Sequence, residues 1–353
     1  MTHAININGR PIGPEHPPYI IAEISANHNG DLSRAMAILR AAKEAGADAA
    51  KLQTYTADTM TIDCDNEDFI IRGGLWDGRK LYDLYVEAHT PWDWHPALFE
   101  EAARIGITIF SSPFDATAVD FLETLNAPAY KIASFELIDI PLIEKCASTG
   151  KPLVMSRGMA TLAEIEEAIV TARDYGCAEI LLLHCNSGYP THPSDSNLST
   201  IKDLSERFKV PVGFSDHTVG STIPAAACAV GACAIEKHVT LSELDEGPDS
   251  AFSTAVDGLS HLIRACHDAY EAIGTPTYQP TPSETENRKL RRSIYAVADI
   301  SAGDILTPEI VRCIRPAEGL RPREYSKVLG TSAARDIVRG EPITWDAIAK
   351  AEK

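Results

Sequence analysis

Two histidines, His217 and His238, each stand in a short polar stretch that follows an apolar run, at 212–214 and 232–235. The residues between the runs are mostly small and predict a helix. In such a strand–helix–strand unit the strands are parallel and their carboxyl ends lie side by side, so both histidines should face one crevice. Converging imidazoles are typical ligands of a divalent metal. The alternative is two unrelated polar residues at strand ends.

Two lysines, Lys51 and Lys131, interrupt runs that are otherwise apolar. A cation in such a place is costly unless it is paired or used. Lysines combined with hydroxyl donors form a pocket for phosphate or carboxylate. Because two such lysines occur together with several hydroxyls, we favour an anion pocket over lysine side chains that extend to solvent from the ends of the strands. Five hydroxyl residues follow neighbouring runs: Ser112, Ser134, Ser156, Ser187 and Ser215.

Three carboxylates are candidates for acid or base chemistry beside these groups. Glu23 and Glu136 are the leading ones, and Asp249 lies in the loop GPDSAFS after the last apolar run. A divalent ion would act as a Lewis acid on a carbonyl oxygen. The residues together predict a phosphorylated substrate that reacts with a carbonyl compound.

Other polar residues receive structural interpretations. Glu236 and Asp216 are expected to pair with Lys237 or to cap helices. Four further histidines are expected at the surface or in structural roles: His28, His95, His192 and His261.

The elements that must position these residues alternate regularly up to about residue 273. Eight apolar runs separated by helical patterns predict a (β/α)₈ TIM barrel, whose active site lies at the carboxyl ends of the strands. The first helix is predicted over 33–45, with Ser33 as its cap and Gly46 as its stop. An aromatic-rich insertion at about 54–92 is a usual place for substrate-binding elements. An open doubly wound sheet is the alternative, but no glycine-rich fingerprint follows the first run.

The remainder of the chain predicts a second, smaller domain. We expect a barrel over 1–275, a linker over 276–290 that is rich in Pro, Thr and charge, and a β-rich domain over 291–353. The net charge of -18 argues against binding to nucleic acid or to anionic membranes. The eight cysteines form no CxxC pair, and neither a signal peptide nor a bilayer-spanning run is visible, which together predict a cytoplasmic protein.

Several motifs resemble the sialic acid synthase family, the phosphoenolpyruvate-dependent synthases of nonulosonic acids. They are IAEISANHNG (21–30), AAKLQTYTADTMT (49–61), YKIASFE (130–136), HCNSGYP (184–190), GFSDHT (213–218) and EKHVTL (236–241). The stretch from about 293 is similar to the antifreeze-like (SAF, β-clip) domain. Within the family, LYDLYVEAHTPWDWH (81–95) and GPDSAFS (247–253) are most similar to the pseudaminic acid synthases, with the N-acetylneuraminate and legionaminate synthases as alternatives.

The resemblance implies roles for the candidate residues. It implies metal-dependent condensation of phosphoenolpyruvate with 2,4-diacetamido-2,4,6-trideoxy-L-altrose, with C–O cleavage and phosphate release. Glu136 would handle the acid/base step, His217 and His238 would bind Mn²⁺ or Mg²⁺, and Arg315 would enter the partner's site in a domain-swapped homodimer. The donor would be held by Lys51, Ser112, Lys131, Ser134, Ser156, Ser187 and Ser215. The acceptor sugar would be surrounded by Glu23, Gln53, Tyr189 and Asp249.

Three positions depart from the family pattern, and two other functions remain open. Arg157 replaces a usual threonine and either adds a cation to the phosphate pocket or points away from it. Ala317 replaces a glycine, and Thr191-His192 replaces a common Ala-Pro. One alternative is a Schiff-base aldolase with Lys131 as nucleophile. The other is a non-catalytic carbohydrate- or ice-binding protein.

Overall fold

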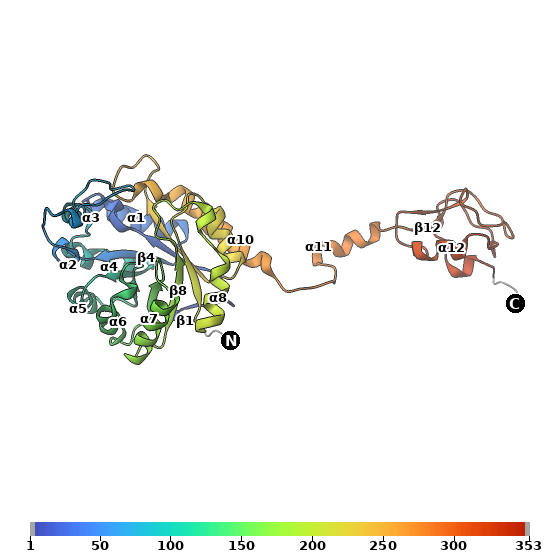
Figure 1. Cartoon of the computed structure of the whole chain (residues 1–353). Helices are drawn as coiled ribbons and strands as arrows, with labels where there is room; N and C mark the ends of the chain where they lie inside the picture. The colour runs from blue at the N-terminus through green and yellow to red at the C-terminus, as the bar shows by residue number, and fades with distance from the viewer. Residues whose placement is uncertain (1–3, 350–353) are drawn as a thin grey trace. The chain divides into compact units, whose positions relative to one another are not determined.

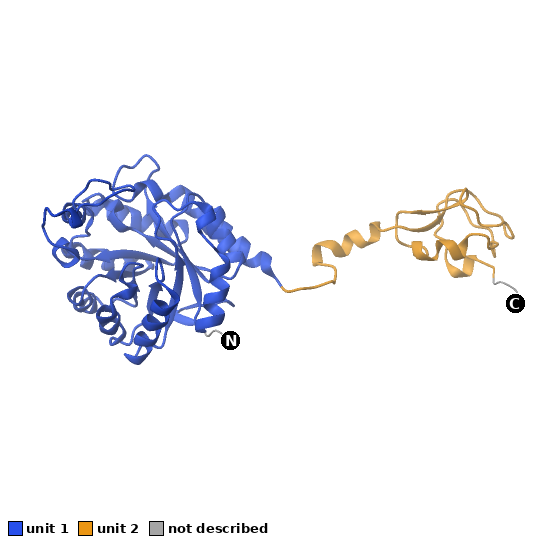
Figure 2. Cartoon of the chain, in the orientation of Figure 1, with its two compact units in different colours: residues 1–274 blue, residues 275–353 orange. Residues whose placement is uncertain are grey.

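The structure is a computed structural model that describes residues 4–349. It comprises two compact units, residues 1–274 and 275–353, which Figure 2 colours separately. Each unit has a hydrophobic core of its own.

The first unit is a closed barrel of eight parallel strands (Figure 1). Closure is given by β10, which pairs with β9 on one side and with β3 on the other. The predicted TIM barrel is therefore confirmed. The strands are β3 (Tyr19–Glu23), β4 (Ala49–Thr54), β5 (Thr108–Pro113), β6 (Tyr130–Ile132), β7 (Leu153–Ser156), β8 (Ile180–Cys185), β9 (Val212–Asp216) and β10 (Ala234–Thr240).

Helices follow the strands and cover the outside of the barrel. They are α1 (Leu32–Ala45), α4 (His95–Ile105), α5 (Ala116–Thr124), α6 (Ile140–Ala147), α7 (Leu162–Asp174), α8 (Ser199–Phe208), α9 (Thr222–Ala229) and α10 (Val256–Ile273). The cap assigned to Ser33 is wrong, because the side chain of Asp31 accepts the hydrogen bond from the Ser33 N–H and begins α1. Gly46 ends the helix as predicted, in a left-handed conformation with φ of 100°.

The last barrel strand is longer than the apolar run indicated. We expected it to end near residue 235, but β10 continues through the polar residues to Thr240, and all seven of its residues are buried. Glu236, Lys237 and His238 therefore lie within a strand, where successive side chains point to opposite faces.

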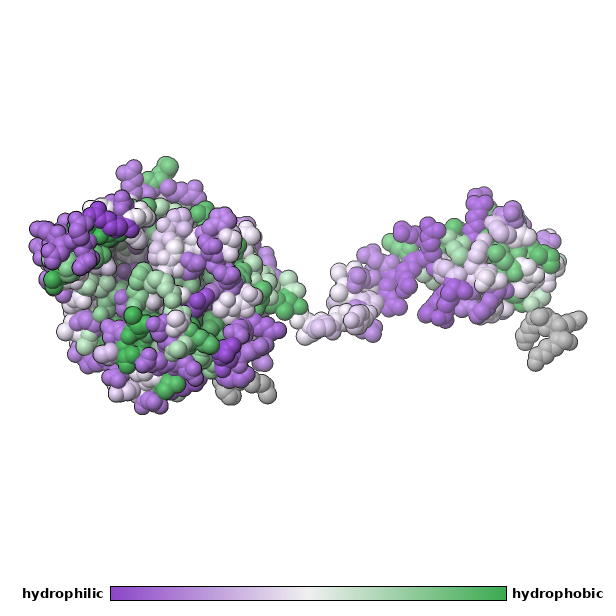
Figure 3. Space-filling model, viewed as in Figure 1, coloured by the Kyte–Doolittle hydropathy of each residue, from purple (hydrophilic) through white to green (hydrophobic). Residues whose placement is uncertain are grey.

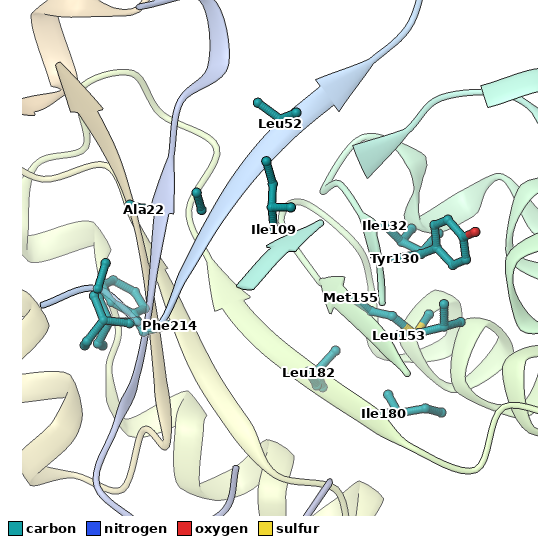
Figure 4. Packing of buried hydrophobic residues seen from close by; sticks show 14 of the residues in the cluster. Ala22, Leu52, Ile109, Tyr130, Ile132, Leu153, Met155, Ile180, Leu182 and Phe214 are labelled. Carbon is teal, nitrogen blue, oxygen red and sulfur yellow. The ribbon is translucent and has the colours of Figure 1, made fainter. Parts of the chain in front are cut away.

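The main core lies between the barrel wall and the helices. Figure 4 shows its side chains on the strands, among them Leu52, Tyr130, Met155 and Phe214. The amino-terminal end of the barrel has a separate core, to which a short hairpin of β1 (Ile5–Ile7) and β2 (Arg10–Ile12) contributes three buried isoleucines. This end is therefore packed shut, and the carboxyl end is left for chemistry.

The predicted insertion after β4 contains α2 (Ala57–Met60), the 3-10 turn η2 (Glu67–Phe69) and α3 (Leu81–Ala88). Between η2 and α3 the chain doubles back. Ile70 and Lys80 form an antiparallel bridge, and the N–H of Ile71 donates to the carbonyl of Arg79 at 2.8 Å. We call residues 70–80 the insertion hairpin.

The second unit is small and mainly irregular. It contains an antiparallel pair of strands, β12 (Ser293–Ala296) and β13 (Val311–Ile314), together with isolated bridges such as Ile300 with Ile337. The stretch before it includes two exposed helical turns, α11 (Pro282–Thr285) and η7 (Glu286–Leu290). Within residues 4–349, no helix is both long and apolar enough to cross a bilayer.

Candidate active site

A cavity of about 750 Å³ opens at the carboxyl ends of the barrel strands. A recess on the larger unit is visible in the space-filling view of Figure 3. All predicted site residues except Glu23 and Arg315 line the cavity. They are Lys51, Gln53, Ser112, Lys131, Ser134, Glu136, Ser156, Ser187, Tyr189, Ser215, His217, His238 and Asp249.

The two histidines lie together at one side of the cavity, with ring centroids 5.3 Å apart. Nδ1 of His217 is 2.8 Å from the carbonyl oxygen of Asn186, and Nδ1 of His238 is 3.0 Å from Oγ of Ser25. Burial lowers the pKa of His217 to about 4 and that of His238 well below its ordinary value, so both rings are neutral at pH 7. Neutral rings oriented through Nδ1 suit metal binding through Nε2.

The two lysines line the same cavity, with carboxylates between them, and we call them and the nearby hydroxyls the lysine side and the histidine pair the histidine side. Nζ of Lys51 is 3.1 Å from Glu23 and 3.1 Å from Glu236. Nζ of Lys131 is 3.9 Å from Glu236. All four side chains are buried. The expected pairing of Glu236 with Lys237 is wrong, because β10 directs Glu236 inward and Lys237 toward the helices, where it pairs with Asp216 as predicted.

Burial and mutual attraction set the protonation of this group. Burial disfavours the charge of Lys51, but Glu23 and Glu236 outweigh it and raise the pKa of Lys51. Burial lowers the pKa of Lys131 to about 8. Burial also opposes the charge on Glu236, but Lys131 and Lys51 outweigh it and lower the pKa of Glu236 to about 2. Glu23 has its pKa raised to about 7 by burial. The lysines thus carry more positive charge than Glu236 alone neutralises.

Several hydroxyls around the lysines are poised for a ligand. The Oγ atoms of Ser112 and Ser156 are buried and have no hydrogen-bond partner in the described protein. Ser187 Oγ donates to Ser134 Oγ at 2.9 Å. The backbone at position 158 lies so close to Ser134 that only glycine fits there, because a Cβ on Gly158 would lie 2.3 Å from the Cβ of Ser134. Buried partnerless hydroxyls beside cations fit an anionic ligand with several acceptor oxygens.

The remaining candidates have contacts of different kinds. The ring of Tyr189 is 4.5 Å from that of His217, and Gln53 donates to Glu23 at 2.9 Å. Asp249 accepts a hydrogen bond of 3.3 Å from the N–H of Ala26, and burial raises its pKa. Burial also raises the pKa of Glu136 to about 7, and one oxygen of this carboxyl has no partner in the described protein. A carboxyl that titrates near neutrality is suited to proton transfer.

Two arginines named from the sequence are not among the residues that line the cavity. Arg157 points away from the cavity, because its Nε lies 3.0 Å and its Nη2 2.8 Å from Nδ1 of His184. It therefore adds no cation to the phosphate pocket, which was the second of the two interpretations drawn from the sequence. Arg315 is an exposed residue of the second unit. Of the other histidines, His28 and His95 are buried and hydrogen-bonded to Thr90 and Thr54.

Several residues of the cavity lining were not predicted, among them Trp76 of the insertion hairpin and Phe252. The ring of Phe252 lies 4.9 Å from His238 and 5.0 Å from Tyr189, so it packs beside the histidine pair. The aromatic composition of the insertion and the GPDSAFS motif were the available signals, but neither has a period that fixes the direction of a side chain.

Comparison with known proteins agrees with this site. Residues 38–278 match the NeuB family. The chain belongs to the NeuB family. The resemblance drawn from the motifs is thereby confirmed, and residues 291–349 of this NeuB-family chain match the SAF domain.

Named relatives cover nearly the whole chain. It is 44% identical to the pseudaminic acid synthase of Helicobacter pylori, over 95% of this chain and 98% of the relative. It is 43% identical to that of Campylobacter jejuni (strain 81-176), over 92% and 95%. Among solved structures, the N-acetylneuraminic acid synthetase of Leptospira borgpetersenii superposes with a TM-score of 0.73 at 31% identity, over 81% of this chain and 95% of that one.

Proposed function

We propose that this enzyme is a pseudaminic acid synthase, which condenses phosphoenolpyruvate with 2,4-diacetamido-2,4,6-trideoxy-L-altrose. The observation that carries the proposal is that one cavity joins a lysine and hydroxyl side to a histidine side. The two relatives at 44% and 43% identity bear this name, whereas the superposed N-acetylneuraminic acid synthetase is 31% identical. N-acetylneuraminate and legionaminate synthases remain the alternative acceptor specificities.

The lysine side is the proposed donor site. Lys51 and Lys131 supply buried positive charge, and Ser112 and Ser156 supply hydroxyls that lack a protein partner. Ser134, Ser187 and Ser215 complete the set. Phosphoenolpyruvate carries a carboxylate and a phosphate, so it offers acceptor oxygens to all of these donors. Fixed positive groups in a buried site stabilise such an anion without reorganisation.

The histidine side is the proposed metal site, for Mn²⁺ or Mg²⁺. The neutral, oriented rings of His217 and His238 fit this role, and within residues 4–349 no cluster of three or more His, Cys, Asp or Glu side chains is arranged to hold a metal. Substrate or water would therefore complete the coordination. When bound, the ion would polarise the aldehyde oxygen of the sugar.

The reaction then balances as follows. C3 of phosphoenolpyruvate attacks the aldehyde carbon of the open-chain sugar, and the aldehyde oxygen gains a proton as the new C–C bond forms. Water adds at C2 and gives up one proton. The C2–O bond to phosphate then breaks, and the C2 hydroxyl proton leaves with the phosphate as C2 becomes a ketone. Donor, sugar and one water give the nine-carbon acid and phosphate.

Glu136 is the proposed base for the water. Its pKa of about 7 allows it to accept a proton at neutral pH, one of its oxygens has no partner in the described protein, and the residue lines the same cavity as the lysines. Gln53, Tyr189 and Asp249 are proposed to hold and orient the sugar, and Glu23, which does not line the cavity, is proposed to act on the sugar side by positioning Gln53. Their carboxyl, amide and phenol groups suit the hydroxyl and acetamido groups of the acceptor.

Arg315 is proposed to act across a domain-swapped homodimer. Its side chain is exposed and forms no ion pair or hydrogen bond among residues 4–349, so it is available for a ligand or a partner subunit. This proposal rests on the match of the Arg-Pro motif to the family pattern.

The deciding experiment measures phosphate release from phosphoenolpyruvate with Mn²⁺ and three acceptors: the L-altrose derivative, N-acetylmannosamine and the legionaminate precursor. We expect turnover with the first to exceed the others. With ¹⁸O in the bridging position of the donor, the label should appear in phosphate. Label retained in the sugar product would contradict C–O cleavage. Inactivation by borohydride in the presence of substrate would favour a Schiff base on Lys131 instead, whose lowered pKa suits that chemistry.

A further inference from the structure

One wall of the cavity comes from the insertion, which contains none of the proposed catalytic or sugar-binding groups. Lys51 and Gln53 lie on the strand before it. The insertion hairpin contributes the apolar residues Ile71, Leu75 and Trp76 to the lining, together with Arg72 and two glycines, and α3 contributes Leu84 and Tyr85. A contiguous apolar wall at the mouth of a polar site is costly to expose unless something apolar covers it. The wall therefore indicates an apolar part of a ligand.

Trp76 is held in this wall by a hydrogen bond to another loop. Its indole Nε1 donates to the carbonyl oxygen of Pro248 at 3.0 Å, which ties the insertion hairpin to the loop that carries Asp249. Because the only polar atom of the indole is used in this bond, the side chain offers the cavity an apolar ring alone. A hydroxyl placed against that ring would gain no hydrogen bond from it.

Trp76 is connected to the histidine pair through the ring of Tyr189. The ring of His217 contacts that of Tyr189 at 4.5 Å, and the ring of Tyr189 contacts that of Trp76 at 5.8 Å. The ring of Tyr189 therefore contacts both a histidine of the pair and Trp76. In the proposed function the aldehyde carbon of the sugar reacts beside the histidines, which leaves Trp76 available to the opposite end of the sugar.

We infer that Trp76 is a specificity-determining residue that recognises the C6 methyl end of the acceptor. This inference rests on the proposed function, because it takes the 6-deoxy sugar as substrate. C6 is the carbon most distant from the reacting C1, and a methyl group there gains from an apolar ring. A hydroxymethyl group would have its hydroxyl desolvated without a partner.

The effect is measured best with a matched pair of acceptors. They are 2,4-diacetamido-2,4,6-trideoxy-L-altrose and its counterpart that retains the 6-hydroxyl, which differ in one oxygen. An apolar pocket discriminates against an added hydroxyl by at most about 100-fold. We expect the wild-type ratio of kcat/KM for the pair to approach this limit, and Trp76→Ala to lower the ratio by about 10-fold or more. The KM of phosphoenolpyruvate should stay unchanged.

A second variant separates recognition from the tether to Pro248. Trp76→Phe keeps an apolar ring but loses the N–H. If Trp76 recognises the methyl group, this variant keeps most of the discrimination, and binding of the 6-deoxy acceptor followed by calorimetry weakens far less than in Trp76→Ala. Ile62→Ala is the matched control, since Ile62 is an exposed residue of the same insertion outside the cavity lining. It should leave both acceptors unaffected.

Two results would overturn the inference. In one, Trp76→Ala and Trp76→Phe lower the turnover of both acceptors equally and leave their ratio unchanged, which is the behaviour of a tether alone. In the other, the wild-type enzyme does not prefer the 6-deoxy member of the pair. Failure of the proposed function is distinct from both, because the wild-type enzyme would then release phosphate only with a different sugar, such as N-acetylmannosamine.

Discussion

Lys237 and Asp216 form an ion pair of 2.6 Å whose side chains are both fully buried. They lie opposite each other on β10 and β9, one residue before His238 and His217. Lys237 also donates to the carbonyl oxygen of Thr218, and Asp216 accepts from the N–H of Thr218 at 3.0 Å. The pair thus fixes the two strand ends from which the histidines project into the cavity.

Breaking this ion pair should destabilise the barrel strongly. Asp216→Asn or Lys237→Met leaves one buried charge unpaired, which costs about 3–5 kcal/mol. The double variant Asp216→Leu/Lys237→Met removes both charges and should be more stable than either single variant. Denaturant unfolding measures these differences. In the double variant, Mn²⁺ affinity measured by calorimetry should remain weakened, because the strand ends are no longer held together.

Asp203→Asn is the control for the ion-pair series. Asp203 and Arg207 form an exposed pair of 3.4 Å on α8, and loss of such a pair changes stability by at most about 1 kcal/mol. Equal effects of the buried and the exposed substitutions would contradict the importance assigned to the buried pair.

Removal of the Ser156 hydroxyl should weaken donor binding without loss of stability. The Oγ atom has no protein partner to lose, whereas a hydrogen bond to a charged ligand contributes about 1.5–3 kcal/mol. Ser156→Ala should therefore raise the KM of phosphoenolpyruvate by roughly 10- to 100-fold. Ser148→Ala, which removes a hydroxyl outside the cavity, should leave this KM unchanged. A loss of stability with unchanged KM would show that Ser156 acts only in folding.

The pH dependence of kcat/KM should be bell-shaped. Glu136 must be deprotonated to act as a base, so activity should fall as the pH drops below its pKa of about 7. Lys131 must be protonated to bind the anionic donor, so activity should also fall as the pH rises above its pKa of about 8. In Lys131→Arg, which stays protonated, the alkaline limb should move upward. An alkaline limb that stays in place would belong to another group.

Metal removal should abolish turnover while the fold persists. Chelation with EDTA should stop phosphate release, and added Mn²⁺ or Mg²⁺ should restore it. His217→Ala should lose Mn²⁺ binding measured by calorimetry, with the circular dichroism spectrum unchanged. Full turnover of His217→Ala with either metal would contradict the assignment of His217 as a ligand.

Complementation should test the action of Arg315 across subunits. Arg315→Ala and His217→Ala should each be nearly inactive. After the two are mixed and allowed to exchange subunits, roughly one quarter of the sites should combine an intact barrel with an intact arginine. If Arg315 acted within its own subunit, no mixed dimer would contain a complete site, and activity would not return.

The barrel and most of the candidate site were predictable because strands and helices have fixed periods. Eight apolar runs gave the eight strands, and polar residues just after a parallel strand must gather at one end of a barrel. Lys51 and Lys131 stood out since a cation in an apolar strand demands a reason. By these two rules, Lys51 and His238, which are 187 positions apart in the chain, were placed in one cavity.

Glu236 shows where this reasoning stopped short. Once β10 is extended to Thr240, strand alternation alone directs Glu236 and His238 inward and Lys237 outward. The apolar run ended at residue 235, however, so the polar residues were assigned to a tail without direction. The barrel buries them because carboxylates, cations and a proposed ligand compensate one another inside it.

Other features were decided only by the tertiary structure, as Arg157 and Trp76 illustrate. The sequence left two directions open for Arg157, and the nearby His184 determined which one it takes. The position of Trp76 depends on a hydrogen bond to Pro248, 172 residues away, within a loop that has no period. Periodic elements determine their side-chain directions locally, whereas the direction of a loop residue depends on contacts that form only when the chain is folded.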